Sequence, residues 1–274
     1  MDFDLKFTEA RDPATPFQCL MALTKHPEVE VRHALLDNPN VLPTDEDGKL
    51  TTSLLEALAR EFPEEVTVHP TFVLHALIEP AKEMGEVVVH VVGRTMDVGL
   101  IEHVFRTWRL DDWRVRRAMA QNPNTPPDTL RLLSNEATES NGYVRRAVAR
   151  NPNTPVDTLR LLGNRGTESS WYVRQAVAEN PTTPEDTLRS LGNEVTESVG
   201  DVRVAVARNP NTPQDTLRIL GNRGTESEWY VRRAVASNPN TPPDILRLLG
   251  NETTESVGSV REAAKKALEA RGLP

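Results

Sequence analysis

Apolar and polar residues recur along the second half of the chain with a period of 29 residues. Self-similarity at a fixed period of this length is typical of solenoid proteins, in which each repeat packs against its neighbours. Six blocks open with Val-Arg and follow one another without insertion or deletion, starting at Val115, Val144, Val173, Val202, Val231 and Val260.

The first half of each block predicts a short helix. In the third block, Val173 and Val177 fall on one face of a helix, and Trp171, two residues before Val173, extends that face. We therefore expect Trp171 to be part of the core. Asn180 precedes a proline, which drives it out of the α region, so the helix is expected to end near Asn180.

The second half of the block predicts another short helix. Thr183 is expected as its N-cap, with Pro184 at the first helical position and Asp186 close to the positive end of the helix dipole. Leu188 lies on the buried side, and Gly192 is expected to end the helix in a left-handed conformation. Helices of about two turns are marginal alone, so we expect order only through packing against neighbouring repeats.

The pattern VRxAVAxNPxTPxDxLxxL closely resembles the leucine-rich repeat variant family of bacteria, and it differs from tetratricopeptide and ankyrin repeats. The resemblance implies an all-α, right-handed α-solenoid of short two-helix repeats in which α and 3₁₀ helices alternate. Some members carry an iron–sulfur cluster on clustered cysteines near the N-terminus. Because Cys19 is the only cysteine here, we expect neither that cluster nor another cofactor or metal.

Three parts are expected along the chain. Residues 1–110 resemble degenerate repeats, residues 111–259 hold five regular repeats, and residues 260–274 form a capping helix that lacks Asn-Pro and runs on to Gly272. Within the first part, residues 12–23 match the second half of a repeat and residues 31–40 the first half.

Other segments of residues 1–110 are less regular. Residues 87–92 have the composition of a strand, but a short apolar run does not distinguish a strand from a buried helix, and the solenoid context favours a helix. The remaining expectations are a polar loop at residues 43–49 and helices at residues 50–61, 71–78 and 101–107.

Charge is divided unevenly. Residues 1–110 contain 19 acids and 10 bases, whereas the rest contains 21 acids and 22 bases. This balance differs from the continuous basic stripe of a duplex-DNA binder. No apolar run is long enough to span a membrane, and the N-terminus lacks a secretory pattern. With a single cysteine, the expected location is the cytoplasm.

Polar residues recur in register as ladders. Arginines and acids occur in nearly equal numbers, which favours pairing within and between repeats over an arginine row left free to hold an acidic ligand. Asparagines before proline are expected to satisfy backbone groups between the helices, with a ligand-binding row as the alternative. The arginines are Arg116, Arg145, Arg174, Arg203, Arg232 and Arg261, with Arg131, Arg160, Arg189, Arg218 and Arg247 in the second helix. The acids are Asp128, Asp157, Asp186, Asp215 and Asp244, with Glu139, Glu168, Glu197, Glu226 and Glu255. The asparagines are Asn38, Asn122, Asn151, Asn180, Asn209 and Asn238.

A second period of 58 residues shows in the aromatic positions. Residues 144–201 and 202–259 are identical at 46 of 58 positions, against 38 of 58 when the alignment slides by one block, so the duplicated unit is a pair of repeats. The place two before Val-Arg alternates between tryptophan (Trp113, Trp171 and Trp229) and glycine (Gly142, Gly200 and Gly258).

Motifs for chemistry are sparse. We find no phosphate loop, no His-Glu-x-x-His and no Gly-x-Ser-x-Gly. Asp45 to Gly48 resembles a calcium loop, but the glycine comes too early and no glutamate closes the loop, so an ordinary turn is expected. His69 and His75 have a poor spacing for a shared metal. Cys19 is expected in the core rather than as a nucleophile.

The sequence therefore predicts a non-enzymatic repeat scaffold that binds a protein or peptide partner. Trp and Tyr neighbours cannot both lie on the buried stripe, so the tyrosines are expected to be partly exposed beside third-position arginines. The alternative is that the tyrosines cover the neighbouring repeat. Two rival functions are a nucleic-acid-binding module, and an enzyme or regulatory subunit whose site lies among the histidines of residues 1–110. The expected partner-binding residues are Tyr143, Tyr172, Tyr230, Arg146 and Arg233.

Overall fold

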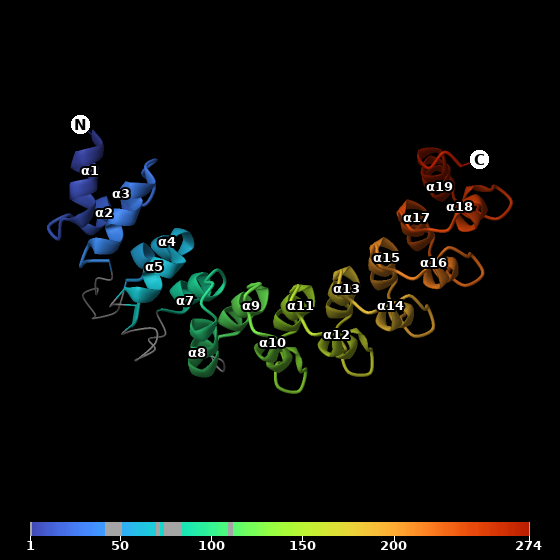
Figure 1. The fold of residues 1–274 in the computed structure, drawn as a ribbon, viewed down its shortest axis with the longest axis horizontal. Coiled ribbons are helices and arrows are strands. Elements are labelled where there is room, and N and C mark those ends of the chain that lie inside the picture. The colour runs from blue at the N-terminus through green and yellow to red at the C-terminus, as the bar shows by residue number, and fades with distance from the viewer. Residues whose placement is uncertain (1, 42–50, 70–71, 74–83, 109–111, 274) are drawn as a thin grey trace. The chain divides into compact units, whose positions relative to one another are not determined.

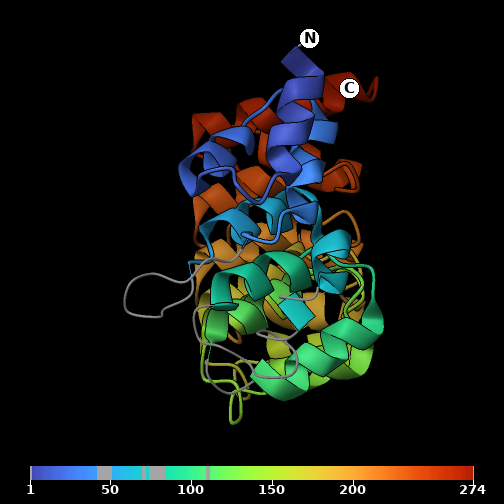
Figure 2. The same ribbon diagram turned by 90° about the vertical axis from the view of Figure 1, so that its left-hand side faces the viewer.

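The computed structural model describes residues 2–41, 51–69, 72–73, 84–108 and 112–273. Every regular element in these ranges is a helix, and no strand occurs there (Figures 1 and 2). The chain divides into two compact units, Met1–Pro126 and Pro127–Pro274. The all-α prediction is therefore confirmed.

The first unit contains the less regular helices. A helix covers residues 85–92, which confirms the helical alternative for the valine-rich segment. The predicted helix at 50–61 begins at residue 53, and the one at 101–107 lies inside a longer helix. The loop at 43–49 and nearly all of the segment at 71–78 lie outside the described residues. The helices are α1 (Asp2–Arg11), α2 (Phe17–Leu23), α3 (Val29–Ala34), the 3₁₀ helix η1 (Leu35–Asp37), α4 (Ser53–Glu61), α5 (Pro63–Val68), α7 (Gly85–Val92), α8 (Val98–Trp108) and α9 (Trp113–Gln121).

Helix α1 has no counterpart among the predicted elements. Its apolar residues Phe3, Phe7 and Ala10 are spaced as on one helical face, a signal that could have predicted it. The helix packs against α3, and the Asn38 side chain donates from Nδ2 to the carbonyls of Ala10 and Asp12, both at 3.0 Å. The same bonds join regular repeats, so α1 is the first helix of a degenerate repeat.

The second unit is built from alternating first and second helices. The first helices follow one another in one row and the second helices in another row beside it (Figure 1). The first helices are α11 (Gly142–Arg150), α13 (Trp171–Glu179), α15 (Gly200–Arg208), α17 (Trp229–Ser237) and α19 (Gly258–Ala270). The second helices are α10 (Pro127–Ser134), α12 (Val156–Gly163), α14 (Glu185–Leu191), α16 (Gln214–Leu220) and α18 (Pro243–Gly250).

The core of this unit lies between the two rows. Valines and alanines of the first helices meet leucines of the second helices, and Val173, Val177, Leu188 and Leu191 are all buried. Each first helix also packs against the first helix of the next repeat. Burial between successive repeats is what orders helices this short.

Both helices of the repeat are α-helices. The resemblance implied alternating α and 3₁₀ helices, but α14 opens with an α-type bond from the Leu188 N–H to the Pro184 carbonyl, at 3.0 Å. Among residues 127–273, no 3₁₀ helix occurs. The chain is therefore a two-helix repeat solenoid of α-helices.

The start of the second helix differs from the prediction. Pro184, rather than Thr183, is the N-cap residue of α14. The Thr183 hydroxyl instead donates to the Val177 carbonyl of α13, at 2.5 Å, and is buried there. A carbonyl without an intrahelical partner at the end of the first helix therefore accepts this hydroxyl, which the sequence pattern had predicted as the N-cap of the second helix.

Gly192 is also used differently from the prediction. Its φ is −85°, so it does not end the helix in a left-handed conformation. A Cβ atom at Gly192 would clash with Thr216 of the next repeat, 2.5 Å away. Glycine is thus required here by the close approach of two repeats, and the left-handed conformation is found at Gly272, after α19.

The asparagine ladder connects successive repeats. Asn209 donates from Nδ2 to the carbonyls of Ala178 and Asn180, at 2.7 and 3.0 Å, and its Oδ1 accepts the N–H of Asn211. At the end of the array, the Arg271 guanidinium donates to the carbonyls of Asn238 and Thr241. Arg271 takes the place of a further asparagine and closes this ladder.

Candidate functional site

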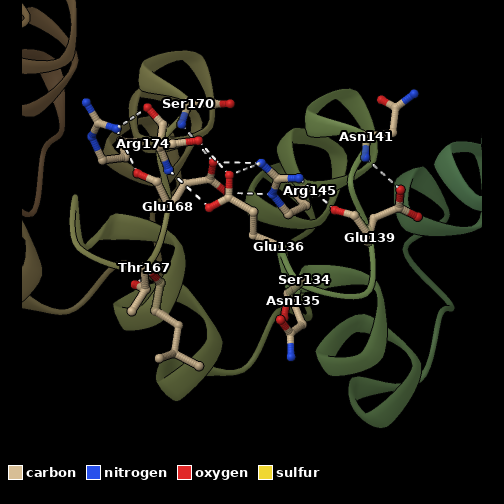
Figure 3. Close-up of polar contacts among 12 residues, drawn as sticks. Ser134, Asn135, Glu136, Glu139, Asn141, Arg145, Thr167, Glu168, Ser170 and Arg174 are labelled. Carbon is tan, nitrogen blue, oxygen red and sulfur yellow. Dashed lines mark hydrogen bonds and ion pairs between the residues drawn. The ribbon is translucent and has the colours of Figure 1, made fainter.

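A buried row of ion pairs runs along the second unit, and we call it the inner ladder. Arg145 donates from Nε and Nη2 to both carboxylate oxygens of Glu168, at 2.6 and 2.8 Å, and from Nη1 to the Glu139 carbonyl at 2.6 Å (Figure 3). Arg145 and Glu168 are each only 1% exposed. Arg174, Arg203 and Arg232 repeat this arrangement with Glu197, Glu226 and Glu255.

The glutamates of the inner ladder are held from two sides. One oxygen of Glu255 also accepts the N–H of Val257, at 2.9 Å, so the carboxylate fastens the start of the next first helix. Burial works to raise the pKa of Glu255, but the bonds from Arg232 and Val257 outweigh it and lower the pKa below its ordinary value. The inner ladder is therefore a structural spine of the array.

A second row of ion pairs lies on the second helices, and we call it the outer ladder. Arg160 contacts Asp186 at 3.0 Å, and Arg189 contacts Asp215 at 3.0 Å. Arg218 and Asp244 make the same contact one repeat on. These side chains are about half exposed, so solvent weakens each pair.

The three tryptophans that stand two residues before Val-Arg are exposed, contrary to the prediction. Trp171 is 43% exposed, and Trp113 and Trp229 are exposed to a similar degree. Each tryptophan is the first residue of its helix, where the chain enters from the link between repeats. The side chain at this first position lies beyond the interface that buries Val173 and Val177, so the buried stripe does not extend to it.

The tyrosines are used in two ways. All three are at least partly exposed, as predicted: Tyr143 is 57% exposed, and Tyr172 and Tyr230 are half-buried. The ring of Tyr172 lies on Gly142 of the preceding first helix, where any Cβ would clash with its hydroxyl, and Tyr230 lies on Gly200 in the same way. The alternation of tryptophan and glycine thus makes room for a tyrosine in every second repeat.

One aromatic cluster stands out on the first helices. The rings of Tyr143 and Tyr172 stack with centroids 5.8 Å apart, and Trp171 meets Tyr172 edge-on at 6.0 Å. We call these three residues the aromatic cluster. Trp229 and Tyr230 repeat the edge-on contact, but Asp201 stands in the place of Tyr143 there. The complete cluster therefore occurs once in the second unit.

The two predicted arginines differ in environment. Arg146 follows Tyr143 by three residues on α11 and is half-buried, and its Nε is buried without a hydrogen-bond partner. Arg233 is exposed and lines an open groove of about 500 Å³ between α17 and α19, with Glu262 and Lys266. Arg146 therefore lies on a helix that also carries a residue of the aromatic cluster, whereas Arg233 does not.

Two histidines of the first unit have a lowered pKa. Arg60 donates to Nε2 of His90 at 3.0 Å, and burial, together with the Arg60 charge, lowers the pKa of His90. Burial likewise lowers the pKa of His69, and His75 lies outside the described residues. Cys19 is half-buried on α2 rather than in the core. Within the described part of the chain, no three His, Cys, Asp or Glu residues could hold a metal ion together.

A helix that crosses a bilayer must be both long and apolar, and the described helices can be compared with that requirement. None of them is both long enough and apolar enough to cross a bilayer.

The helices, the inner ladder and the asparagine ladder together define an α-solenoid of two-helix repeats. The family model for the leucine rich repeat variant matches residues 113–135, 144–165, 200–223 and 229–251, so repeats of this type extend across residues 113–251. The chain therefore belongs to the leucine-rich repeat variant family. No curated protein matches the chain.

Proposed function

We propose that the chain is a non-enzymatic scaffold of the cytoplasm that binds a protein or peptide partner through the first helices of its second unit. The observation that carries this proposal is the aromatic cluster of Tyr143, Trp171 and Tyr172, two of which are exposed. Clustered Tyr and Trp side chains are enriched in protein interfaces, where they bury a large area at little cost in side-chain entropy.

Arg146 supports the same surface. Its half-buried side chain lies three residues from Tyr143, so the two are neighbours on the same helix. Arginine is the charged residue most often found beside aromatic anchors at binding hot spots. A partner that offers an acceptor beside an apolar or aromatic side chain would fit this surface.

The ladders favour a protein partner over a nucleic acid. Arginines of the inner ladder are buried against glutamates, and those of the outer ladder face aspartates. Binding of a phosphate backbone needs cations whose counterions are released, and arginines already paired with carboxylates supply few of these.

Photo-crosslinking in the cells that produce the protein tests this function. A benzoylphenylalanine at position 143 is expected to crosslink to a protein, and Arg146→Ala is expected to weaken that product. Position 229 is the matched control, since Trp229 has the exposure of Trp171 but lacks a counterpart of Tyr143. Equal products at both positions, no product at 143, or a nucleic-acid product would contradict the proposal.

Trp171→Ser refines this test. Because Trp171 is exposed, the substitution should change the melting temperature little while reducing the crosslink at position 143. Tyr172 and Tyr230 are unsuitable for this purpose because they also support packing on Gly142 and Gly200.

A further inference from the structure

Glu136, Gly142 and Arg145 form what we call a link receptor, because they hold residues 164–172, the link that leads from α12 into α13. Arg145 binds the Glu168 carboxylate, and Glu136 accepts bonds from the Ser169 hydroxyl at 2.5 Å and the Ser169 N–H at 3.3 Å. Gly142 carries the Tyr172 ring. The receptor therefore contacts a glutamate, the serine after it and the tyrosine four residues after the glutamate.

The same receptor occurs again one pair of repeats later. Arg203 binds Glu226 at 2.6 and 2.9 Å, and Glu194 accepts a 2.6 Å bond from the Ser227 hydroxyl. Gly200 carries the Tyr230 ring. Because both copies bind the pattern Glu-Ser-x-x-Tyr, the three contacts form one recognition unit.

A third copy lies at the end of the array. Glu252, Gly258 and Arg261 have the same spacing in sequence, and Arg261 donates from Nη1 to the carbonyls of Glu255 and Ser256, at 2.9 and 2.8 Å. Those bonds orient the guanidinium as in the earlier copies. In the part of the chain that the structure describes, however, Nε and Nη2 of Arg261 and the carboxylate of Glu252 have no partner.

The place of the tyrosine is also open. A Cβ atom on Gly258 would have only Arg261 Nη2 nearby, at 3.8 Å, whereas at Gly142 and Gly200 it would clash with a tyrosine hydroxyl. Glu252, Gly258 and Arg261 line one depression of about 600 Å³ on α19. All three elements of the receptor thus lie together without the ligand that fills the earlier copies.

We propose that Glu252, Gly258 and Arg261 bind a segment of a partner protein that carries the pattern Glu-Ser-x-x-Tyr. Arg261 binds the glutamate carboxylate with two parallel bonds, Glu252 accepts from the serine, and the tyrosine ring lies on Gly258. Arg271 already closes the asparagine ladder, so the partner supplies a link-like segment and not a whole repeat.

Recognition at this site depends on geometry more than on net charge. Lys265, Lys266 and Arg261 are balanced in the depression by three glutamates. Long-range attraction of acidic peptides is therefore weak, and the paired donors of Arg261 select a carboxylate at one position. The site is separate from the aromatic cluster, so either proposal can fail without the other.

The test uses the full chain, labelled with ¹⁵N, and a capped peptide with the sequence of residues 164–175, whose one carboxylate is that of Glu168. Titration is expected to shift the Nε–Hε resonance of Arg261 and to saturate. A peptide with Gln in place of that glutamate should bind about tenfold or more weakly, because the charge-assisted bonds are lost. Equal binding of the two peptides would overturn the proposal.

Variants of the chain give an independent measure. Arg261→Lys keeps the charge but removes the parallel donors, and we expect a loss of about tenfold or more. Gly258→Ala has room in the fold but places a Cβ where the tyrosine ring would lie. It should weaken the peptide with Tyr but not one with Ser at that position. Arg223→Lys, an exposed link arginine outside the receptor, is the control and should change nothing.

Two further outcomes would count against the proposal. Acetate or inorganic phosphate, at the concentration of the peptide, should leave the Arg261 resonance unchanged. If either ion shifts it as far as the peptide does, the site binds small anions and the peptide proposal is wrong. Unchanged peptide affinity in both Arg261→Lys and Gly258→Ala would likewise exclude this receptor.

Discussion

The inner and outer ladders use the same chemistry with opposite exposure. Arg203 and Glu226 of the inner ladder have side chains that are each 1% exposed, whereas Arg189 and Asp215 of the outer ladder are 46% and 61% exposed. Both pairs join neighbouring repeats, and both recur every 29 residues. Period alone therefore does not distinguish a structural spine from a solvated surface.

Burial changes what each ladder contributes. Removing a charged pair from water costs several kcal/mol per ion, so the inner ladder is stabilising only because each guanidinium nitrogen of Arg203 donates a hydrogen bond and both oxygens of Glu226 accept one. Its main effect is to select the register in which each repeat meets the next. The half-exposed outer ladder has a smaller desolvation cost, and solvent screening leaves it only a small contribution to stability.

Loss of one inner partner should have the largest effect. Arg203→Ala leaves Glu226 buried without its counter-ion, and we expect the free energy of unfolding to fall by about 3–5 kcal/mol. Urea denaturation followed by tryptophan fluorescence measures it. The double variant Arg203→Met with Glu226→Met removes both charges and should cost less than the single variant. A single variant that costs under about 1 kcal/mol would contradict the role of the spine.

The asparagine ladder is buried like the inner ladder, but its side chains carry no charge. Asn209→Ala leaves two carbonyls and one N–H without their bonds in a buried place, and we expect a loss of about 2–3 kcal/mol. Asn211→Ala is the control, since that side chain makes one exposed bond to the Pro181 carbonyl and should cost less than about 1 kcal/mol. Similar losses for both variants would show that burial is not the deciding factor.

Acid should act on both ladders. Burial acts to raise the pKa of Glu255, but the hydrogen bonds from Arg232 and Val257 outweigh it and lower the pKa from 4.5. A hydrogen bond from Arg189 lowers the pKa of Asp215 from 3.8. A carboxylate whose pKa is lower in the folded state than in the unfolded state stabilises the fold at pH values above its unfolded-state pKa. This stabilisation is lost as the pH falls through its folded-state pKa. Unfolding free energies measured from about pH 5 to about pH 3 should therefore decrease.

Salt separates the two contributions to that decrease. About 1 M NaCl should remove most of the share due to exposed Asp215 and little of the share due to buried Glu255. Asp215→Asn and Glu255→Gln, each compared with the unchanged chain, assign the shares. A pH dependence that salt abolishes completely would contradict the difference in burial.

Loss of an outer partner should have the smallest effect. Arg189 contacts Asp215 of the next repeat and Glu185 of its own helix, with all three side chains exposed. Arg189→Ala is expected to lower the free energy of unfolding less than any other variant described above, and high salt should reduce even that difference. A loss as large as that of Arg203→Ala would mean that the two ladders are equivalent.

The sequence by itself determined the repeat and most of its local structure. Asn180 before Pro181 ends the first helix as predicted, and the valine and leucine positions that were expected in the core are buried. These features depend on residues within one or two turns, where proline and helical periodicity act directly on the backbone. The family followed from the same local pattern.

Tertiary structure alone decided how the repeats meet. Atoms of the next repeat, and not its φ, require glycine at position 192, and Trp171 is exposed because the interface between repeats does not reach the first residue of its helix. The packing of Tyr172 on Gly142 showed in the sequence only as the alternation of tryptophan and glycine with a period of 58 residues. Likewise, two arginine ladders with one period became a buried spine and an exposed surface. Contacts between residues about 29 positions apart depend on how two helices dock, which neither helix encodes alone.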